Sequence, residues 1–367
     1  MKIVVTGSKG FIGRNLCFFL KEQHHDVLEI HRDTKQQDIH GYLSQADFVF
    51  HLAGINRPKN PSEFKLGNVD LTQFIIDRLS ASNRGSPIVL ASSKQADDNS
   101  DYGISKYAAE KIVEDYSQIT GAASYIYRLP NVFGKWCKPN YNSFIATFCN
   151  NIANGIGISV NDVSTPVRLA YIDDVCDSFL ALLDGNVSSG FQKLRTEFNT
   201  TVGEVSNIIL SFKSNRTSLV VEPVGSGLTR ALYSTYLSYI SPDNFNYSIP
   251  SYIDERGVFC EMLKTKDSGQ FSYFTAHPGI TRGGHYHHTK TEKFLVISGE
   301  AVFKFENITT GKQYELTVSG SMPEIVETVP GWAHDITNIG DKELIVMLWS
   351  NEIFDDKKPD TIAKDVF

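Results

Sequence analysis

Apolar positions follow two different patterns along this chain. In the first half, short apolar runs with the length of buried strands recur at residues 2–6, 27–30, 48–52 and 87–91. Longer stretches with a helical period separate them, and residues 10–21 form the first of these. Strands that alternate with helices pair in parallel, because each helix returns the chain to the start of the next strand. The first half is therefore predicted to be an α/β domain with a parallel sheet.

The second half has closely spaced strands and no helical stretches between them. From about Phe271 onward, runs rich in Val, Ile, Phe and Tyr are separated by Gly, Asn and Pro turns, as at residues 292–297, 301–305 and 343–348. This spacing is typical of a small antiparallel barrel or sandwich. We therefore expect an all-β domain to follow the α/β domain.

A polar stretch at about residues 225–250 lies between the two patterns. It is rich in Ser, Tyr, Asn and Pro, and it has no clear helical period. The chain has 367 residues, of which 41% are hydrophobic, enough for two cores at roughly 100 to 200 residues per domain. We place the boundary in this stretch and predict domains of residues 1–245 and 246–367.

Charge and cysteine content restrict the partners and the compartment. The chain carries 35 Lys and Arg against 42 Asp and Glu, without a long basic run, so neither nucleic acid nor an anionic membrane is expected as its main partner. No apolar run approaches the roughly 18 residues of a membrane span, and residues 1–6 lack the layout of a signal peptide. Five widely spaced cysteines without a CxxC pair favour buried free thiols. These features indicate a cytoplasmic protein.

A glycine-rich turn follows the first predicted strand. Gly7, Gly10 and Gly13 form a GxxGxxG pattern, and Phe11 and Ile12 open the following helix. Glycines at these positions allow a tight turn and let a pyrophosphate approach the backbone at the helix N-terminus, where unpaired N–H groups and the helix dipole favour anions. The turn therefore predicts a dinucleotide site.

The residues after the second predicted strand bear on which dinucleotide binds. An acidic residue at this point would hold the free 2'-hydroxyl of NAD. Here His31 and Arg32 follow Ile30 instead. Arg32 favours the 2'-phosphate of NADPH, although Asp33 directly beyond it leaves NAD as an alternative.

A serine, a tyrosine and a lysine form the candidate catalytic group. Ser93 follows the strand at residues 87–91, and Tyr102 and Lys106 form a YxxxK pattern at the head of the next predicted helix. A spacing of four places Tyr102 and Lys106 on one helical face. A nearby ammonium favours the ionised phenol and so lowers its pKa, which suits Tyr102 to pass a proton to a carbonyl oxygen while hydride reaches the carbon. Ser93 is expected to hydrogen-bond the same oxygen.

Taken together, these residues resemble the extended short-chain dehydrogenase/reductase family, whose members act on nucleotide-activated sugars. Further matches are His51-Leu52-Ala53-Gly54 and the segments 128–134 and 171–175. The resemblance implies a Rossmann-like, doubly wound parallel sheet, catalysis by the Ser-Tyr-Lys group, and cofactor contacts that also include Leu52, Ala53, Gly54, Tyr102 and Lys106. It further implies a sugar-nucleotide substrate near Asn131, Lys138, Asn142 and Arg168, among which Lys138 and Arg168 are suited to pair with a diphosphate.

Histidines in the second half resemble the two cupin motifs. His285, His287 and Glu292 fit the first motif, G-x5-H-x-H-x4-E-x6-G, and His334 fits most of the second. Residues two apart on a strand face the same side, so His285 and His287 are expected to point into the barrel and meet Glu292 and His334. Three imidazoles and a carboxylate suit Zn, Fe, Ni or Mn. We expect a metal here, with Zn²⁺ as the first choice.

A second resemblance competes over the same residues. The segments 254–259, 282–286 and 331–334 are similar to the sugar-nucleotide 3,5-epimerase branch of cupins. In that branch a histidine at the place of His285 is a general base, and no metal is present. His287 and Glu292 depart from the branch, and a metal-bound His285 would leave the base unassigned.

Along nearly its whole length the chain resembles the bifunctional capsular polysaccharide enzymes of the CapF type. This resemblance implies a UDP-4-keto-6-deoxy-N-acetylhexosamine substrate, whose C3 is epimerised by the cupin domain and whose C4 ketone is reduced with NADPH by the first domain, toward UDP-N-acetyl-L-fucosamine. The C3 proton is removable only while C4 is a ketone, so epimerisation has to come first. A homodimer through the cupin domain is expected, since cupins of this kind pair by strand exchange.

Other function classes remain open at this point. The cupin is also compatible with a 3,4-ketoisomerase or a metal-dependent oxygenase. A non-catalytic sugar-nucleotide sensor that retains its cofactor is a further alternative, and the presence of Ser93, Tyr102 and Lys106 together speaks against it.

Overall fold

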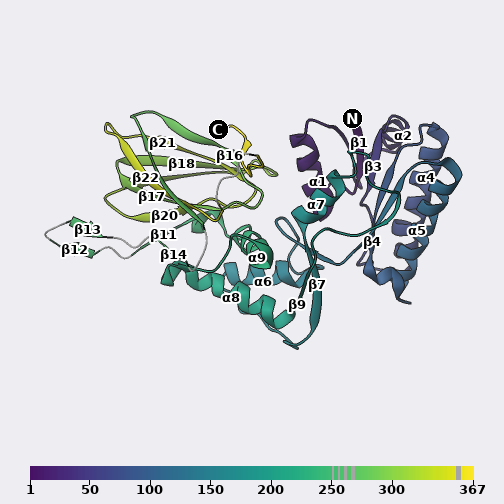
Figure 1. Ribbon diagram of the computed structural model, residues 1–367, viewed down its shortest axis with the longest axis horizontal. Coiled ribbons are helices and arrows are strands. Elements are labelled where there is room, and N and C mark those ends of the chain that lie inside the picture. Colours follow the sequence, from purple (N-terminus) through teal and green to yellow (C-terminus); the bar gives the residue numbers. More distant parts are fainter. Residues whose placement is uncertain (250–251, 255–256, 260–262, 266–268, 353–356) are drawn as a thin grey trace. The chain divides into compact units, whose positions relative to one another are not determined.

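The structure is a computed structural model, and it divides into two compact units (Figure 1). Unit 1 comprises Met1–Phe133 and Val167–Asn199, and unit 2 comprises Gly134–Pro166 and Thr200–Phe367. These units group segments by the contacts between them, and they do not mark a boundary along the chain. The predicted domain boundary near residue 245 therefore stays a prediction. The residues that the structure describes are 1–249, 252–254, 257–259, 263–265, 269–352 and 357–367.

A six-stranded parallel sheet forms the centre of unit 1. Its order is β2-β1-β3-β4-β5-β8, and all neighbouring strands run parallel. The strands are β1 (Lys2–Thr6), β2 (Asp26–Ile30), β3 (Phe48–His51), β4 (Ile88–Ser93), β5 (Ser124–Leu129) and β8 (Gly190–Gln192). The chain leaves β1 to one side for β2 and crosses to the other side for β3. Open α/β sheets bind ligands at such a switch point, beyond the carboxyl ends of the strands.

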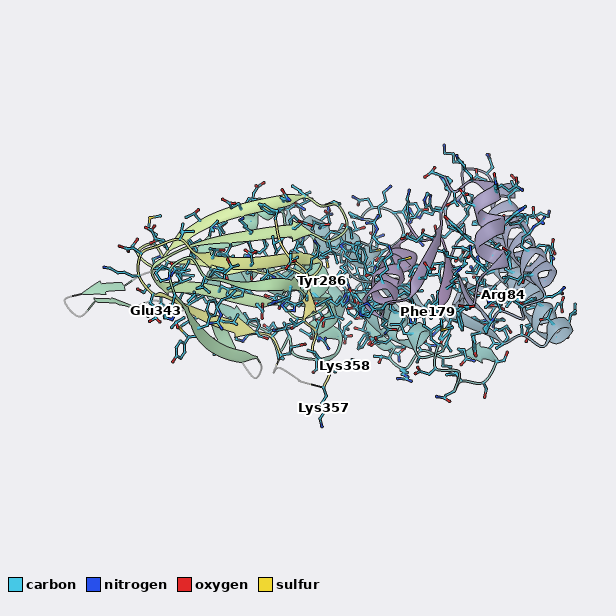
Figure 2. All side chains as sticks on the ribbon, turned by 90° about the horizontal axis from the view of Figure 1, so that it is seen from above. Arg84, Phe179, Tyr286, Glu343, Lys357 and Lys358 are labelled. Atoms are coloured by element: carbon cyan, nitrogen blue, oxygen red, sulfur yellow. The ribbon has the colours of Figure 1, made fainter. Side chains whose placement is uncertain are left out.

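Helices cover both faces of this sheet (Figure 1). Helices α1 (Phe11–Glu22) and α7 (Ile172–Leu180) pack together, and α4 (Leu71–Ser82) packs against α2 (Gln36–Ser44) and α5 (Asp101–Thr120). Phe179 of α7 is buried against Phe50 of β3, with ring centroids 5.8 Å apart (Figure 2). The doubly wound parallel sheet expected from the sequence is confirmed.

Shorter elements complete unit 1. A turn of α-helix, α3 (Ser62–Phe64), continues into the π-helical η1 (Lys65–Asp70), and the 3-10 turn η2 (Lys94–Asp97) follows β4. A second sheet has the order β6-β7-β9. Its strands are β6 (Asn131–Phe133), β7 (Pro166–Tyr171) and β9 (Phe198–Thr201).

Two five-stranded antiparallel sheets dominate unit 2 (Figure 1). One has the order β11-β20-β17-β22-β15, with β11 (Asn246–Ser248), β20 (Glu324–Glu327), β17 (Glu292–Ser298), β22 (Leu344–Ser350) and β15 (Gln270–Ala276). The other has the order β19-β18-β21-β16-β23, with β19 (Gln313–Ser319), β18 (Glu300–Asn307), β21 (Trp332–Asn338), β16 (Thr281–Tyr286) and β23 (Ile362–Ala363). Phe294 of one sheet meets Phe303 of the other at 5.5 Å between ring centroids, so the two inner faces share a core. The predicted all-β second half is confirmed.

Small sheets and helices surround these strands. The paired strands are β12 (Tyr252–Asp254) with β13 (Gly257–Phe259), and β10 (Val220–Val221) with β14 (Lys264–Thr265). The helices are α6 (Phe144–Ala153), α8 (Val202–Ser218), α9 (Gly227–Leu237) and the 3-10 turn η3 (Pro242–Asn244). Helix α8 begins with a capping box, in which Thr201 and Glu204 satisfy each other's backbone N–H groups.

Helix α9 corrects one expectation. Residues 225–250 show no helical period in the sequence, yet Gly227–Leu237 is a helix. Its residues from Ala231 to Leu237 are all buried, on every side of the helix. A helix that is buried all round carries no amphipathic stripe, so periodicity could not reveal it.

Two further expectations concerned free, buried cysteines and the absence of a membrane span. Cys17, Cys137, Cys149 and Cys176 are free and buried, whereas Cys260 lies outside the described residues. Glu255 and Arg256, which belong to the epimerase-like segment 254–259, also lie outside them. Among the described residues, no helix combines the length and the apolar character needed to cross a bilayer.

Candidate functional site

The glycine turn lies at the switch point of the parallel sheet. Gly7 has a φ of +69°, and a Cβ there would lie 2.8 Å from the backbone nitrogen of Ala53 after β3. A Cβ on Gly13 would overlap the carbonyl oxygen of Gly7, so the helix needs glycine to pack this close. Helix α1 begins after Gly10, which has no side chain to cap the first-turn N–H groups. The turn thus offers backbone donors to an anionic ligand.

Thr6 joins this turn to the end of β3, a role that no sequence motif indicates. Its Oγ1 accepts hydrogen bonds from the backbone nitrogens of Leu52 and Ala53, both at 3.1 Å. The same oxygen lies 2.7 Å from Nδ1 of His51. Thr6 therefore fixes the Leu52-Ala53 backbone directly beside the predicted cofactor turn.

His51 is a buried, neutral link in this network. Burial, with a contribution from Lys106, lowers the pKa of His51 to about 3. Its Nε2 lies 2.9 Å from Oγ1 of Thr72, whose proton is donated to the carbonyl oxygen of Asn68 at 2.5 Å. Nε2 of His51 therefore carries the hydrogen, and Nδ1 accepts from the Thr6 hydroxyl. The motif His51-Leu52-Ala53-Gly54 thus has a structural reason for beginning with histidine.

The structure brings Ser93, Tyr102 and Lys106 together. Ser93 ends β4, and its hydroxyl lies close enough to the Tyr102 phenol to influence the phenol pKa. Tyr102 and Lys106 lie on the first turns of α5, which begins at Ser100, whose hydroxyl caps the helix by accepting from the backbone nitrogen of Gly103 at 3.0 Å. The buried Lys106 donates to the carbonyl oxygen of Ala91 on β4 at 2.6 Å. Strand β4 therefore holds both ends of the group.

The pKa values in this group differ from the expectation. Burial raises the pKa of Tyr102, and the neighbouring Ser93 hydroxyl only partly opposes this. Burial lowers the pKa of Lys106 to about 8, against the opposing effect of the Glu110 carboxylate. The phenol pKa is thus raised by desolvation instead of being lowered as expected, and the pKa of the Lys106 amine itself moves toward neutral pH.

Arg32 occupies the position expected for it. The end of β2 lies at the glycine turn, because the backbone nitrogen of Ser8 donates to the carbonyl oxygen of Ile30 at 3.2 Å. Arg32 follows two residues later and is exposed. The Asp33 carboxylate lies 3.5 Å from Nδ1 of His31. Arg32 thus lies two residues beyond Ile30, whose carbonyl oxygen is bonded to the candidate cofactor turn.

The predicted substrate residues are divided between the two units. Asn131 on β6 and Arg168 on β7 are exposed, but the parallel register pairs Asn131 with the residue after Arg168, so their side chains leave opposite faces. Nε of Arg168 lies 3.7 Å from the Glu197 carboxylate, which partly neutralises the guanidinium charge. Lys138 and Asn142 are exposed residues of unit 2.

The predicted metal ligands converge in unit 2. His285 on β16, His287 directly after it, Glu292 on β17 and His334 on β21 place one ligand atom each within 4.8 Å of one another. Oε2 of Glu292 lies 3.1 Å from Nε2 of His287 and 3.4 Å from Nε2 of His334. The His285 ring centroid lies 4.7 Å from that of His334. Both sheets of the sandwich contribute to this cluster.

The donors of this cluster fit a divalent cation. Nδ1 of His287 contacts the main-chain carbonyl oxygen of Asp360, so this nitrogen carries the hydrogen, and a neutral ring directs the lone pair of Nε2 at the Glu292 carboxylate. Two lone pairs 3.1 Å apart repel unless a proton or a cation lies between them. Both ring nitrogens of His334 are buried without a hydrogen-bond partner among the described residues. A metal ion would satisfy His287, Glu292 and His334 together.

The electrostatics of the cluster agree with this fit. Burial, with repulsion from His334 and His287, lowers the pKa of His285 to about 4. Burial also lowers the pKa of His334. Burial opposes ionisation of Glu292, but the neighbouring His287 and His334 side chains outweigh it and hold the carboxyl pKa well below its usual range. Neutral imidazoles and an ionised carboxylate are the forms that bind metal.

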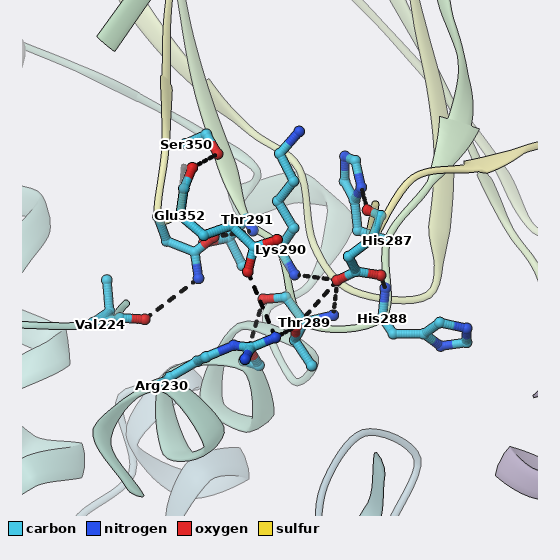
Figure 3. Close-up of polar contacts among 12 residues, drawn as sticks. Val224, Arg230, His287, His288, Thr289, Lys290, Thr291, Ser350 and Glu352 are labelled. Atoms are coloured by element: carbon cyan, nitrogen blue, oxygen red, sulfur yellow. Dashed lines mark hydrogen bonds and ion pairs between the residues drawn. The ribbon is translucent and has the colours of Figure 1, made fainter. Parts of the chain in front are cut away.

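Two residues near the cluster had no signal in the sequence. Nζ of Lys290 lies 2.8 Å from Oε1 of Glu292, the oxygen turned away from the histidines. Asp360 contacts His287 and the turn after it (Figure 3), although the two residues lie 73 positions apart in the chain. Separation of this size hides the partnership from motif spacing.

Both halves of the chain match known protein families. Residues 3–192 match the NAD dependent epimerase/dehydratase family, and residues 252–362 match the family described as polysaccharide biosynthesis C-terminal domain. A UDP-2-acetamido-2,6-beta-L-arabino-hexul-4-ose reductase from Pseudomonas aeruginosa is 51% identical over 368 residues, which cover 100% of this chain and 99% of the relative.

Solved structures are similar over the same ranges. The crystal structure of the capsular polysaccharide assembling protein CapF from Staphylococcus aureus superposes with a TM-score of 0.69 at 41% identity, covering 100% of both chains. The UDP-N-acetylglucosamine 4-epimerase from Bacillus cereus has a TM-score of 0.52 at 27% identity, covering 59% of this chain and 82% of that chain. The first likeness is to the whole chain, and the second is to part of it.

Proposed function

Because the chain belongs to the NAD dependent epimerase/dehydratase family and, over its full length, to the CapF-type capsular polysaccharide proteins, we propose that it is a bifunctional nucleotide-sugar enzyme. In this proposal the C-terminal half epimerises C3 of a UDP-4-keto-6-deoxy-N-acetylhexosamine. The N-terminal half then reduces the C4 ketone with NADPH, on the route to UDP-N-acetyl-L-fucosamine. The observation that carries the proposal is the full-length identity of 51% to a reductase of such a ketosugar.

The reductase step is assigned to Ser93, Tyr102 and Lys106. NADPH supplies the hydride when it is bound. The Tyr102 phenol protonates the C4 oxygen, and the neighbouring Ser93 hydroxyl positions the same oxygen. The Lys106 ammonium, held by the Ala91 carbonyl, supplies the positive charge that favours the phenolate left behind.

Cofactor binding is assigned to the glycine turn and its neighbours. The uncapped start of α1 and the Leu52-Ala53 backbone fixed by Thr6 support a pyrophosphate and ribose site at the switch point. The exposed Arg32 after β2 supports a preference for the 2'-phosphate of NADPH. We assign the sugar nucleotide to the neighbourhood of Asn131, Lys138, Asn142 and Arg168.

The epimerase step is assigned to the cluster of His285, His287, Glu292 and His334, with Zn²⁺ as the proposed metal. The metal, when bound, supplies positive charge that stabilises an enolate oxygen. The C3 proton is acidic only beside a C4 ketone, and reduction removes that ketone. Epimerisation therefore precedes reduction, which gives a chemical reason for both activities in one chain.

We also propose a homodimer through the C-terminal half. Strand β15 lies at the edge of its sheet, and its Phe271 and Tyr273 side chains are exposed. Aromatic side chains on an open edge strand support pairing with a second copy. Analytical ultracentrifugation of wild type and Tyr273→Lys tests this, and a wild-type monomer would contradict it.

The reductase assignment is tested by NADPH oxidation with a UDP-4-keto-6-deoxy-N-acetylhexosamine. Tyr102→Phe removes the proton donor and should abolish turnover while NADPH still binds. Tyr107→Phe, an exposed tyrosine on the same helix, is the matched control and should turn over at the wild-type rate. Normal turnover by Tyr102→Phe would refute the catalytic role. Binding without turnover in wild type would favour the sensor alternative.

The epimerase assignment is tested in D₂O without NADPH. Exchange at C3 is expected in wild type and should be lost in Glu292→Gln. The NMR spectrum of the product also separates the alternatives, because a 3,4-ketoisomerase would leave a ketone at C3. Absence of deuterium at C3 in wild type would refute the epimerase assignment.

A further inference from the structure

The ligands His287 and Glu292 are joined by residues 288–291, here called the ligand loop, which is held from several elements (Figure 3). On one side, helix α9 supports Thr289: Ser234 donates its hydroxyl to the carbonyl oxygen of Thr289 at 2.9 Å, and Arg230 donates to its Oγ1. The loop is therefore packed against a buried helix instead of being left in solvent.

The end of the loop is held by main-chain and side-chain bonds to Asn351, just after β22. Oδ1 of Asn351 accepts from the Thr291 nitrogen at 2.9 Å, and the Asn351 nitrogen donates to the Thr291 carbonyl oxygen at 3.1 Å. Glu292 then enters β17 with its backbone nitrogen bonded to Oγ1 of Thr328 at 3.1 Å. These bonds fix the backbone of Glu292 and so the point from which its carboxylate reaches the cluster.

Asp360 holds the beginning of the loop. Its carboxylate accepts from the backbone nitrogens of His288 at 2.8 Å, Thr289 at 2.7 Å and Lys290 at 2.7 Å. The Thr289 hydroxyl adds a fourth bond at 3.1 Å. Three consecutive N–H groups directed at one carboxylate form strong charge-assisted hydrogen bonds. A shortened side chain at this position cannot replace them, and a neutral amide can replace them only in part.

Asp360 also orients the His287 ring. Its main-chain carbonyl oxygen is the partner of His287 Nδ1, which leaves Nε2 for the cluster. The segment around Asp360 is itself fixed beside the first ligand strand: β23 pairs with β16, with Ala363 opposite His285, and the Lys364 nitrogen donates to the Gly284 carbonyl oxygen at 2.9 Å. The C-terminal segment therefore supports two of the four ligands.

From these contacts we infer that Asp360 is a positioning residue for the metal site, acting through His287 and the ligand loop. The inference rests on the proposed metal site. It adds to that site a residue that acts through the ligands and not through contact with substrate. Groups that orient metal ligands typically change metal affinity by about 10- to 100-fold when they are altered. Asp360→Ala is expected to raise the Kd for Zn²⁺ by about this factor, and Asp360→Asn by less, because the amide keeps one accepting oxygen.

The experiment uses full-length protein stripped of metal. The Kd for Zn²⁺ is measured by competition with a chromogenic chelator, and the absorption spectrum of the Co²⁺ form reports ligand geometry. Asp365→Asn, an exposed aspartate of the same terminal segment, is the matched control and should bind Zn²⁺ as wild type does. The supporting result is a weaker Kd and an altered Co²⁺ spectrum in Asp360→Ala alone.

Thermal melting in EDTA separates positioning from general stability. A metal-free Asp360→Ala that melts lower but binds Zn²⁺ with the wild-type Kd would overturn the inference, because the residue would then only brace the fold. An equal loss of affinity in Asp365→Asn would also overturn it. If wild type binds neither Zn²⁺ nor Co²⁺, the proposed metal site is refuted, and the inference about Asp360 is refuted with it. If wild type binds the metal and Asp360→Ala binds it equally well, only the role of Asp360 is refuted.

Discussion

Replacing Glu327 is predicted to destabilise unit 2 more than replacing Glu327 and its partner Lys293 together. Lys293 follows the ligand Glu292 on β17 and is buried, and its ammonium pairs with the buried Glu327 carboxylate on β20. Arg216 of α8 pairs with the same carboxylate, and the Lys293 ammonium also lies 3.0 Å from the Tyr247 hydroxyl. The cluster joins the helical part of the unit to the sheet that carries Glu292.

The magnitude follows from what each substitution leaves behind. Glu327→Met removes the carboxylate with which Lys293 and Arg216 both pair and leaves the Lys293 ammonium buried, and removing one partner of a buried pair costs about 3–5 kcal/mol. At about 2–4 °C per kcal/mol for a unit of this size, the melting temperature should fall by roughly 6–20 °C. Adding Lys293→Met removes the buried ammonium, and Arg216, whose side chain is 20% exposed, keeps its hydrogen bond to the Asn244 carbonyl oxygen, so the double variant should recover most of the loss.

The assay is urea unfolding followed by tryptophan fluorescence, for wild type, both single variants and the double variant. Lys312→Met, an exposed lysine in a turn, is the matched control and should stay within about 0.5 kcal/mol of wild type. A double variant whose loss equals the sum of the single losses would refute the reasoning, because additivity means that the charges do not interact. A loss below about 1 kcal/mol in Glu327→Met would refute it as well.

The pH dependence gives an independent check with a fixed sign. Burial opposes ionisation of Glu327, but the charges of Lys293 and Arg216 outweigh it and lower the Glu327 pKa below its ordinary value of 4.5. A carboxyl whose pKa is lowered on folding stabilises the protein above the unfolded pKa, and this contribution is lost as the pH falls through the folded pKa. Wild type should therefore lose stability on acidification below about pH 4.5, and the double variant should lose less.

Three further outcomes are expected. The kcat for ketone reduction should fall as the pH rises through about 8, where the buried Lys106 ammonium loses its proton, and a rate that stays level to pH 10 would contradict this. Gly331→Ala should lower the melting temperature, because Gly331 has a φ of +81° and an added Cβ would lie 2.8 Å from the Trp136 ring; an unchanged melting curve would refute it. Thr6→Val should cost about 1–3 kcal/mol, because it strands the Nδ1 acceptor of His51 and two backbone donors, and should raise the KM for NADPH; fluorescence titration with NADPH checks the latter.

The parts of the site that could be predicted from the sequence are those in which chemistry and spacing are local. Gly7, Gly10 and Gly13 follow one strand, and Tyr102 and Lys106 lie one helical turn apart, so their geometry is set by the element that carries them. The parallel sheet and the antiparallel strands are predictable for the same reason, since apolar period reports each element by itself.

The parts that could not be predicted depend on contacts between distant segments. Asp360 meets His287 across 73 positions, and Thr6 meets His51 across 45. Neither aspartate nor threonine has a pattern of its own, so only the folded chain reveals these partners. The pKa of Tyr102 belongs to the same class: spacing indicates a neighbouring lysine, but the degree of burial decides the direction of the shift.

The distribution of contacts in unit 2 also bears on how the two proposed activities can be separated. A fragment that begins near residue 246 would keep all four proposed metal ligands but lose α9, whose Arg230 and Ser234 bond to the ligand loop. It would also lose Arg216 and leave the Lys293–Glu327 pair without its third charge. Local motifs locate the ligands in the second half, whereas the groups that hold them in place come from both sides of the predicted boundary. The half that carries the proposed metal ligands therefore depends on residues 200–245 for the geometry of its site, even though no proposed ligand lies among them.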